Sequence, residues 1–308
     1  MLQAGTQLHD RYRVLRRIGR GGMGAVYEAV DTRLRNTVAV KQLEIAGAAA
    51  DRAFEREAQL LAGLRHPVLP VVIDYFSAAH HAFLVMQYIE GEDLEHHLGR
   101  QQRPCERDEV IAWANALLDG LEYLHSRTPA IVHRDIKPAN VKRTPAGDIV
   151  LLDFGLAKGR LDSDPTVSPD SGLYGFTLQY APPEQIDGHR TDVRSDLFAL
   201  GATLYHLATG SLPFEGRTGE EVLAKQVLES LSGERIRALH LSPQVHYFIE
   251  KMMQKEREIR FQDPQQLQTE VRAWLDARAA QRELEEQAKD RPRLGGAAAE
   301  RRRRRRRF

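Results

Sequence analysis

The spacing of the apolar residues changes once along the chain, near residue 90, and this change limits the folds open to it. From Tyr12 to about Tyr88, short segments rich in β-branched and aromatic residues are separated by glycine or polar turns, which is typical of strands (YRVLRRIG, AVYEAV, TVAVKQL and AFLVMQYI). Residues 51–64 interrupt them with apolar residues at helical spacing, and Gly63 and Pro67 mark the end of that helix. The first part is therefore predicted to be β-rich with one helix.

Beyond residue 90 the pattern becomes helical. An apolar stripe runs through residues 108–126, with Asp108 as the predicted N-cap. Residues 197–214 carry no formal charge but include a histidine, glycines, a proline and hydroxyls, which indicates a buried core helix and a turn rather than a membrane span. The last globular helix is predicted over residues 264–277, beyond which the apolar stripe thins to alanines.

Composition and charge limit the class of protein. The 308 residues are 42% apolar and 28% charged, which suits one large or two modest globular domains. The single cysteine, Cys105, cannot form an internal disulfide, and the N-terminus lacks the apolar stretch of a secretory signal, so we expect an intracellular setting. Without the seven arginines 301–307 the chain is mildly acidic, which argues against a nucleic-acid-binding domain with a basic face.

Three glycines, Gly19, Gly21 and Gly24, occur in the order GxGxxG. Glycines let backbone amides approach phosphates closely, although the motif alone fits a flexible turn equally well. A strand-like segment follows it instead of a helix, which argues against the dinucleotide-binding arrangement, and no GxxxxGK[ST] is present for a P-loop. A strand, a glycine turn and a second strand fit a lid over a nucleotide.

Charged residues lie at the ends of several apolar segments. Lys41 ends VAVK, and because lysine is seldom buried unpaired, it needs an exposed position or a partner such as Glu55 or Glu57. The segments HRDIKPAN (133–140) and LLDFGLAK (151–158) add aspartates, a lysine and an asparagine. Side-chain oxygens together with phosphate oxygens suit Mg²⁺, and a further aspartate can accept the proton of an attacking hydroxyl. Each residue alone also fits a solvated charge.

Taken in order, seven segments resemble one family. They are the glycine motif, Lys41 in VAVK, Glu57, HRDIKPAN, DFG, APPE at 181–184 and SDLFALG at 195–201. Over roughly residues 11–276 the chain resembles the eukaryotic-like (Hanks-type) serine/threonine protein kinases of bacteria. The resemblance implies an α+β, bilobal protein-kinase fold, with a small β-rich N-lobe that has one key helix (11–86), a hinge (87–90) and a larger, mainly helical C-lobe (91–276). Residues 1–10 would be an N-terminal extension and residues 277–308 a charged tail, helical or disordered.

The resemblance also implies roles at the site. Asp135 would orient the substrate hydroxyl, Lys137 would steady the γ-phosphate, and Lys41, held by Glu57, would reach the α- and β-phosphates. The implied cofactors are ATP and Mg²⁺, for which Mn²⁺ could substitute. The implied metal ligands are Asn140 and Asp153. The implied nucleotide-binding residues are Gly19, Gly21, Gly24, Val26, Ala39, Lys41, Met86, Gln87 and Ile89.

Regulation and stability are implied at other positions. Arg134, expected to be otherwise unpaired, could receive a phosphate from the loop between Asp153 and Glu184. The candidate acceptors in that loop are Thr166, Ser168 and Ser171. Thr177 would contact the catalytic loop. Glu184 would pair with Arg260, and Asp196 would tie the buried helix to the catalytic loop.

The implied activity is transfer of the ATP γ-phosphate to serine or threonine hydroxyls of proteins, with autophosphorylation in trans within a homodimer. The lysine in DIKPAN is typical of the serine/threonine kinases rather than of the tyrosine kinases. The alternative is a pseudokinase, a scaffolding module of the same fold. The presence of all the expected catalytic residues argues against it: Lys41, Glu57, Asp135, Asn140 and Asp153.

The arginine run, residues 301–307, allows several interpretations. It would bind any polyanion, including nucleic acid as an accessory partner, with a strong salt dependence. A basic cluster after a helical segment also resembles a cytoplasmic juxtamembrane segment. We therefore expect a cytoplasmic kinase that contacts an anionic membrane surface and is tethered through a segment beyond Phe308. A soluble chain with a disordered tail is the other interpretation.

Overall fold

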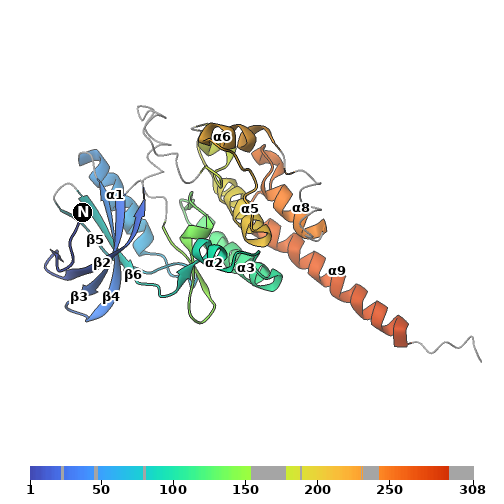
Figure 1. The fold of residues 1–308 in the computed structure, drawn as a ribbon, viewed down its shortest axis with the longest axis horizontal. Helices are drawn as coiled ribbons and strands as arrows, with labels where there is room; N and C mark the ends of the chain where they lie inside the picture. Colours follow the sequence, from blue (N-terminus) through green and yellow to red (C-terminus); the bar gives the residue numbers. More distant parts are fainter. Residues whose placement is uncertain are drawn as a thin grey trace, which may run out of the picture. The chain divides into compact units, whose positions relative to one another are not determined.

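The computed structural model describes residues 1–21, 24–44, 48–78, 81–153, 178–187, 189–229, 231 and 243–290. Residues 1–265 form one compact unit, and residues 266–308 form a second. In the first unit, strands dominate up to residue 87 and helices dominate after residue 93 (Figure 1). The predicted change from strands to helices is confirmed.

The first part is a six-stranded antiparallel sheet in the order β1-β2-β3-β4-β6-β5. Its members are β1 (Gln7–Leu8), β2 (Tyr12–Gly21), β3 (Gly24–Asp31), β4 (Asn36–Glu44), β5 (Val72–Ala78) and β6 (His81–Gln87). The one helix among them, α1 (Ala48–Ala62), packs against β5, where the rings of Phe54 and Tyr75 meet edge to face. It begins three residues earlier than the prediction and ends two residues earlier.

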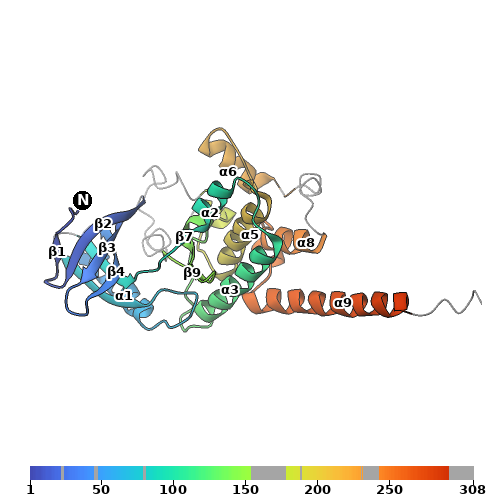
Figure 2. The ribbon, with the colours of Figure 1, turned by 60° about the horizontal axis from the view of Figure 1, so that its bottom comes forward.

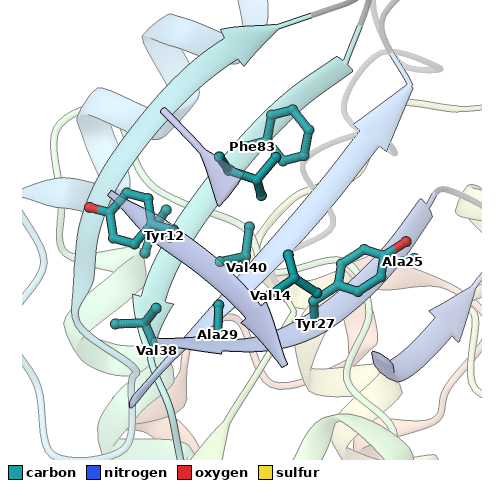
Figure 3. Packing of buried hydrophobic residues seen from close by; sticks show 10 residues of the cluster. Tyr12, Val14, Ala25, Tyr27, Ala29, Val38, Val40 and Phe83 are labelled. Carbon is teal, nitrogen blue, oxygen red and sulfur yellow. The ribbon is translucent and has the colours of Figure 1, made fainter. Parts of the chain in front are cut away.

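One face of this sheet forms a core. Successive residues of a strand point to opposite faces, and β3 accordingly alternates between intermediate and buried positions along its whole length. Figure 3 shows the buried side chains that gather on this face, among them Tyr27, Val40 and Phe83. The ring of Phe83 stacks on that of Phe76, with centroids 5.0 Å apart. The side chains on the opposite face of the sheet are not part of this core.

The second part is mainly helical. It contains β7 (Glu92–Asp93), α2 (Leu94–Gln101), α3 (Arg107–His125), the 3-10 turn η1 (Pro138–Asn140), β8 (Val141–Arg143), β9 (Ile149–Leu151), α4 (Pro183–Ile186), α5 (Val193–Thr209), α6 (Gly219–Leu228), α8 (Pro243–Met252) and the 3-10 turn η3 (Arg257–Ile259). The strands β7, β8 and β9 form a small antiparallel sheet. α3 and α5 pack against each other (Figure 2).

α5 is the predicted core helix, and most of its side chains are buried. It begins with a capping box, in which the Asp192 side chain accepts hydrogen bonds from the backbone while Ser195 Oγ accepts from the backbone N–H of Asp192 at 3.2 Å. It ends at Gly210 in the left-handed conformation (φ 72°). The predicted N-cap of α3 is wrong. Glu106 occupies the N-cap position of that helix without a side-chain hydrogen bond to it, and Asp108 lies in the first turn, where a carboxylate interacts favourably with the positive end of the helix dipole.

The last helix, α9 (Pro264–Asp290), joins two predicted segments. The prediction ended the last globular helix at residue 277, where the apolar stripe thins, and left the tail after it as either helical or disordered. Alanine, arginine, glutamate and glutamine dominate the segment that follows, and these residues favour a helix without needing an apolar face. Among the described residues, no helix is long and apolar enough to cross a membrane.

Phe83→Ala should lower the free energy of unfolding by about 3–5 kcal/mol, because it removes a buried ring and leaves a cavity in the core of the sheet. The measurement is chemical denaturation followed by circular dichroism. The control is Leu34→Ala, at a side chain that is 64% exposed, which should change stability by no more than about 0.5 kcal/mol. Equal losses for the two variants would contradict this account of the core.

Candidate functional site

Residues 131–140, the second part of the connection between α3 and β8, bring three charged or polar side chains together. Asn140 donates from Nδ2 to the backbone oxygen of Asp135 at 2.7 Å and to its Oδ2 at 2.9 Å. Lys137 Nζ lies 3.2 Å from the same Oδ2. The carboxylate of Asp135 is therefore held by one cation and one amide, and its side chain is 13% exposed.

The buried carboxylate of Asp196, from the first turn of α5, fixes the start of this loop. Its Oδ2 accepts from the backbone N–H of His133 and its Oδ1 from that of Arg134, both at 2.8 Å. His125 Nε2 lies 2.8 Å from Oδ2. Burial alone would raise the pKa of Asp196, but the hydrogen bonds from His125 and from the loop hold it below its ordinary value.

Arg134 differs from the prediction. It was expected to be otherwise unpaired, whereas its Nε donates to Thr191 Oγ1 at 3.0 Å. Its backbone is in the left-handed conformation (φ 66°), which is rare for a residue with a side chain, and the bond to Asp196 stabilises it there. The expected phosphate acceptors Thr166, Ser168 and Ser171, and also Thr177, lie outside the described residues.

On the sheet, the strand register places the expected nucleotide-binding side chains on one face. Val26 pairs with Lys41, and Ala39 pairs with Met86. Directly paired residues of neighbouring strands, and residues two apart on one strand, share a face, so all four side chains lie opposite the core of Figure 3. Gln87 ends β6, where its backbone N–H donates to Val71, and the chain then leaves the sheet toward β7.

The glycines of the predicted phosphate-binding turn lie in the β2–β3 hairpin. Gly19 pairs with Val26, and Gly21 pairs with Gly24. A Cβ atom on Gly24 would lie 1.9 Å from the carbonyl oxygen of Gln42, so the approach of β4 requires glycine at this position. A Cβ atom on Gly19 would make only ordinary contacts with Val26, so the sheet itself does not require glycine there.

Lys41 has a different described partner from the one predicted. Its Nζ lies 3.0 Å from Asp153 Oδ1. Glu57, the expected partner, belongs to α1, but its side chain lies outside the described residues. Asp153 is in the left-handed conformation (φ 59°). The expected phosphate-binding lysine and an expected metal ligand therefore meet, although 112 positions separate them in the sequence.

The two expected metal ligands belong to neighbouring segments. Leu152, the residue before Asp153, donates its backbone N–H to the carbonyl oxygen of Asn140 at 2.7 Å. An aspartate and an asparagine offer hard oxygen ligands, which fit Mg²⁺ when phosphate oxygens complete the shell. In the described part of the chain, no group of three or more His, Cys, Asp or Glu side chains could hold a metal ion, so protein ligands of these types alone do not form a complete site there.

Glu184 and Arg260 form a buried bidentate ion pair. The two Nη–Oε distances are 2.7 and 2.9 Å, and Ser195 Oγ donates to Oε1 at 2.7 Å. Burial would raise the pKa of Glu184, but the Arg260 guanidinium and Ser195 hold it below its ordinary value. Further donors of Arg260 bind the carbonyl oxygens of Gln254 and Lys255. The pair connects α4 to the end of η3.

Two parts of the site were missed by the sequence analysis. His125 binds Asp196, and its only signal was a histidine at the C-terminal end of a predicted helix, just before the loop. His206 lies 2.7 Å, Nδ1 to hydroxyl, from Tyr180. In the sequence, its only signal is a polar residue inside the uncharged segment 197–214.

Comparison with known proteins identifies the family. Residues 12–271 match the protein kinase domain. The chain belongs to the protein kinase family. It is 36% identical over 280 residues to a probable serine/threonine-protein kinase of Streptomyces coelicolor and 34% identical over 276 residues to serine/threonine-protein kinase PknB of Mycobacterium tuberculosis. The predicted bacterial, eukaryotic-like family is confirmed.

These alignments cover 88% and 86% of this kinase chain but only 41% and 43% of the relatives. The chain therefore spans less than half the length of the curated relatives it matches. A solved structure of Rad53 1-466 in complex with AMP-PNP has a TM-score of 0.69 at 21% identity, over 83% of this chain and 64% of that chain. This likeness confirms the predicted bilobal kinase fold.

Arg260→Met should lower the free energy of unfolding by about 3–5 kcal/mol, because it leaves the Glu184 carboxylate buried and unpaired. Chemical denaturation of Arg260→Met, of Glu184→Gln and of the double variant Arg260→Met/Glu184→Gln provides the measurement. The double variant should lose less free energy of unfolding than the two single variants lose together. Arg103→Met, which removes an exposed pair with Glu106, should leave the unfolding midpoint unchanged. A simple sum in the double variant would mean that the two residues are not coupled.

Proposed function

We propose that this chain is an active serine/threonine protein kinase, which transfers the γ-phosphate of ATP to protein hydroxyls and phosphorylates its own loop between Asp153 and Glu184. The observation that carries the proposal is the cluster formed by Asp135, Lys137 and Asn140, beside a segment whose Asp153 meets Lys41. In this assignment residues 1–10 are an extension, 11–86 the N-lobe, 87–90 the hinge, 91–276 the C-lobe and 277–308 a tail. The family and its named relatives support the same reaction.

The proposed mechanism relies on positioning and charge. Asp135 would orient the substrate hydroxyl and accept its proton, since its carboxylate is partly exposed and a carboxylate can act as a general base. Lys137 would face the transferring phosphate. Mg²⁺, held through Asn140 and Asp153, would neutralise phosphate charge when bound. Lys41 would bind the α- and β-phosphates in place of its contact with Asp153.

The pseudokinase alternative has no support from a specific observation. A scaffolding module of this fold would need no cluster of charged side chains where residues 131–140 meet the segment that ends at Asp153. Here the side chains of Lys41, Asp135, Lys137, Asn140 and Asp153 are present and connected by short contacts. We therefore propose an enzyme.

Asp135→Asn should lower kcat by roughly 10²–10⁴-fold, because the amide cannot accept the proton of the substrate hydroxyl. Lys41→Ala should also abolish detectable transfer. Incubation with Mg-ATP followed by intact-mass analysis and a generic serine/threonine substrate provides the measurement. The matched control is Asp148→Asn, at an exposed turn between β8 and β9, which should behave as wild type. If wild type neither gains phosphate nor transfers it, the chain is a pseudokinase.

The proposal extends to partners and location. Protein substrates follow from the family, and we propose autophosphorylation between two copies of the chain. We also propose a cytoplasmic kinase whose arginine run contacts an anionic membrane surface, on the sequence of residues 301–307 alone, since these residues lie outside the described part.

The full chain should sediment with vesicles that contain phosphatidylserine, and the bound fraction should fall as salt is added, because clustered arginines bind anionic lipid through screened electrostatic attraction. A variant with glutamine at residues 301–307 should stay in solution. Vesicles of phosphatidylcholine alone and double-stranded DNA are the controls. Tighter binding to the DNA than to the vesicles, at the same salt concentration, would favour a nucleic-acid role for the run.

A further inference from the structure

Three side chains of α5 hold segments around the catalytic loop. Asp196 binds the backbone of residues 133 and 134, as described above. Two turns later on the same helix face, Thr203 Oγ1 lies 3.4 Å from the carbonyl oxygen of Ile136. One turn further, His206 Nδ1 lies 2.7 Å from the hydroxyl of Tyr180. His206 is the one of these three side chains that can change its charge near neutral pH.

Tyr180 belongs to a segment that borders the site. Its side chain is only 3% exposed, and the carbonyl oxygen of the next residue, Ala181, accepts from Gln226 Nε2 at 2.6 Å. Farther along the segment, Gln185 Nε2 lies 3.4 Å from the carbonyl oxygen of Arg134, the residue before Asp135. Residues 178–185 therefore run from the His206 contact to the catalytic loop. A shift of Tyr180 would move the surface beside Asp135.

The Tyr180–His206 hydrogen bond depends on protonation. Burial raises the pKa of Tyr180, and the negative charge of Glu95 on α2 raises it further, so the hydroxyl keeps its proton and acts as the donor. The imidazole nitrogen can accept that proton only while His206 is neutral. Burial lowers the pKa of His206 and prevails over Glu215, which faces it from the segment after α5 and acts in the opposite direction.

Protonation of His206 would place a hydrogen on Nδ1. The Tyr180 hydroxyl could then no longer donate to this atom and would have to rotate and accept instead. The new positive charge would also attract the carboxylates of Glu215 and Glu95. Because Tyr180 is buried, water cannot replace the hydrogen bond that its hydroxyl loses, so we expect the side chain and the segment around it to shift.

We propose that His206 is a positioning residue for the protein substrate. In its neutral form it holds Tyr180, and through it residues 178–185, in the arrangement that receives the substrate beside Asp135. Protonation loosens that segment and weakens binding of the protein substrate, while binding of ATP is unchanged. This inference rests on the proposed kinase activity.

The first test is the pH dependence of the kinetic constants from about pH 5 to about pH 8, where imidazoles titrate. Below the pKa of His206, KM for a protein substrate should rise, and kcat/KM should therefore fall by about tenfold per pH unit. This fall comes in addition to any loss of activity that His206→Gln shows at the same pH. KM for ATP should stay constant. His206→Gln keeps an acceptor for the Tyr180 hydroxyl but does not titrate, so it should remove this rise in KM. His189→Gln, at an exposed histidine, should keep the wild-type profile.

Tyr180→Phe removes the donor and should raise KM for the protein substrate over the whole pH range. A second readout is an NMR titration of the His206 imidazole, which needs no turnover. The pKa of His206 should be below its ordinary value in wild type and higher in Tyr180→Phe, because the hydroxyl stabilises the neutral form. A fold check by circular dichroism for both variants separates loss of position from loss of structure.

The outcomes separate the inference from the proposed function. Absence of phosphate transfer at every pH overturns the kinase activity and the substrate role together. Normal transfer, with the same pH dependence of KM in wild type and His206→Gln, overturns the inference alone. An equal rise of KM for ATP, or a pKa of His206 that does not respond to Tyr180→Phe, also overturns it.

Discussion

The buried carboxylate of Asp196 is the constraint on which the geometry of the loop 131–140 depends. A carboxylate without solvent exposure is costly unless strong hydrogen bonds replace its water. Asp196 receives such bonds from His125 and from two successive backbone N–H groups. Those N–H groups belong to the loop, so the same bonds that stabilise the charge also keep Arg134 in its rare left-handed conformation. Because Asp135 is the next residue, the bonds from Asp196 on α5 also determine its position.

In the six-stranded sheet, one strand register determines both the core and the position of Lys41. Because a strand alternates its side chains between two faces, the register that buries Tyr27, Val40 and Phe83 in the core also aligns Val26 and Lys41 on the opposite face. A slip of one residue would exchange the two faces and lose both the core and the site. The core of the sheet and the position of Lys41 are therefore set by one register, and the hairpin of Gly24 is where that register begins.

Local patterns predicted most of the helices and strands, but they did not predict the contact of Lys41 with Asp153 or that of His125 with Asp196. The alternation around Val40 and the uncharged run in α5 are local signals, and both predicted elements are present. The contact of Lys41 with Asp153 and that of His125 with Asp196 join segments far apart in the sequence, so they depend on packing that no window of sequence contains. The apolar stripe alone did not decide where α9 ends, because helix propensity extends this helix to Asp290.

Exposure and hydrogen bonding separate the carboxylates that stabilise the fold from those that can act on a ligand. The side chains of Asp196 and Glu184 are 0% and 6% exposed, and several donors satisfy each of them, so neither can exchange a partner without a large loss of stability. The side chains of Asp135 and Asp153 are 13% and 35% exposed, and each is paired with one lysine. A contact between a partly solvated carboxylate and a lysine contributes less to stability than a buried ion pair, so such a contact is the easier one to exchange. Exposure therefore makes Asp135 and Asp153 the carboxylates that a ligand can reach, whereas Asp196 and Glu184 stabilise the surrounding fold.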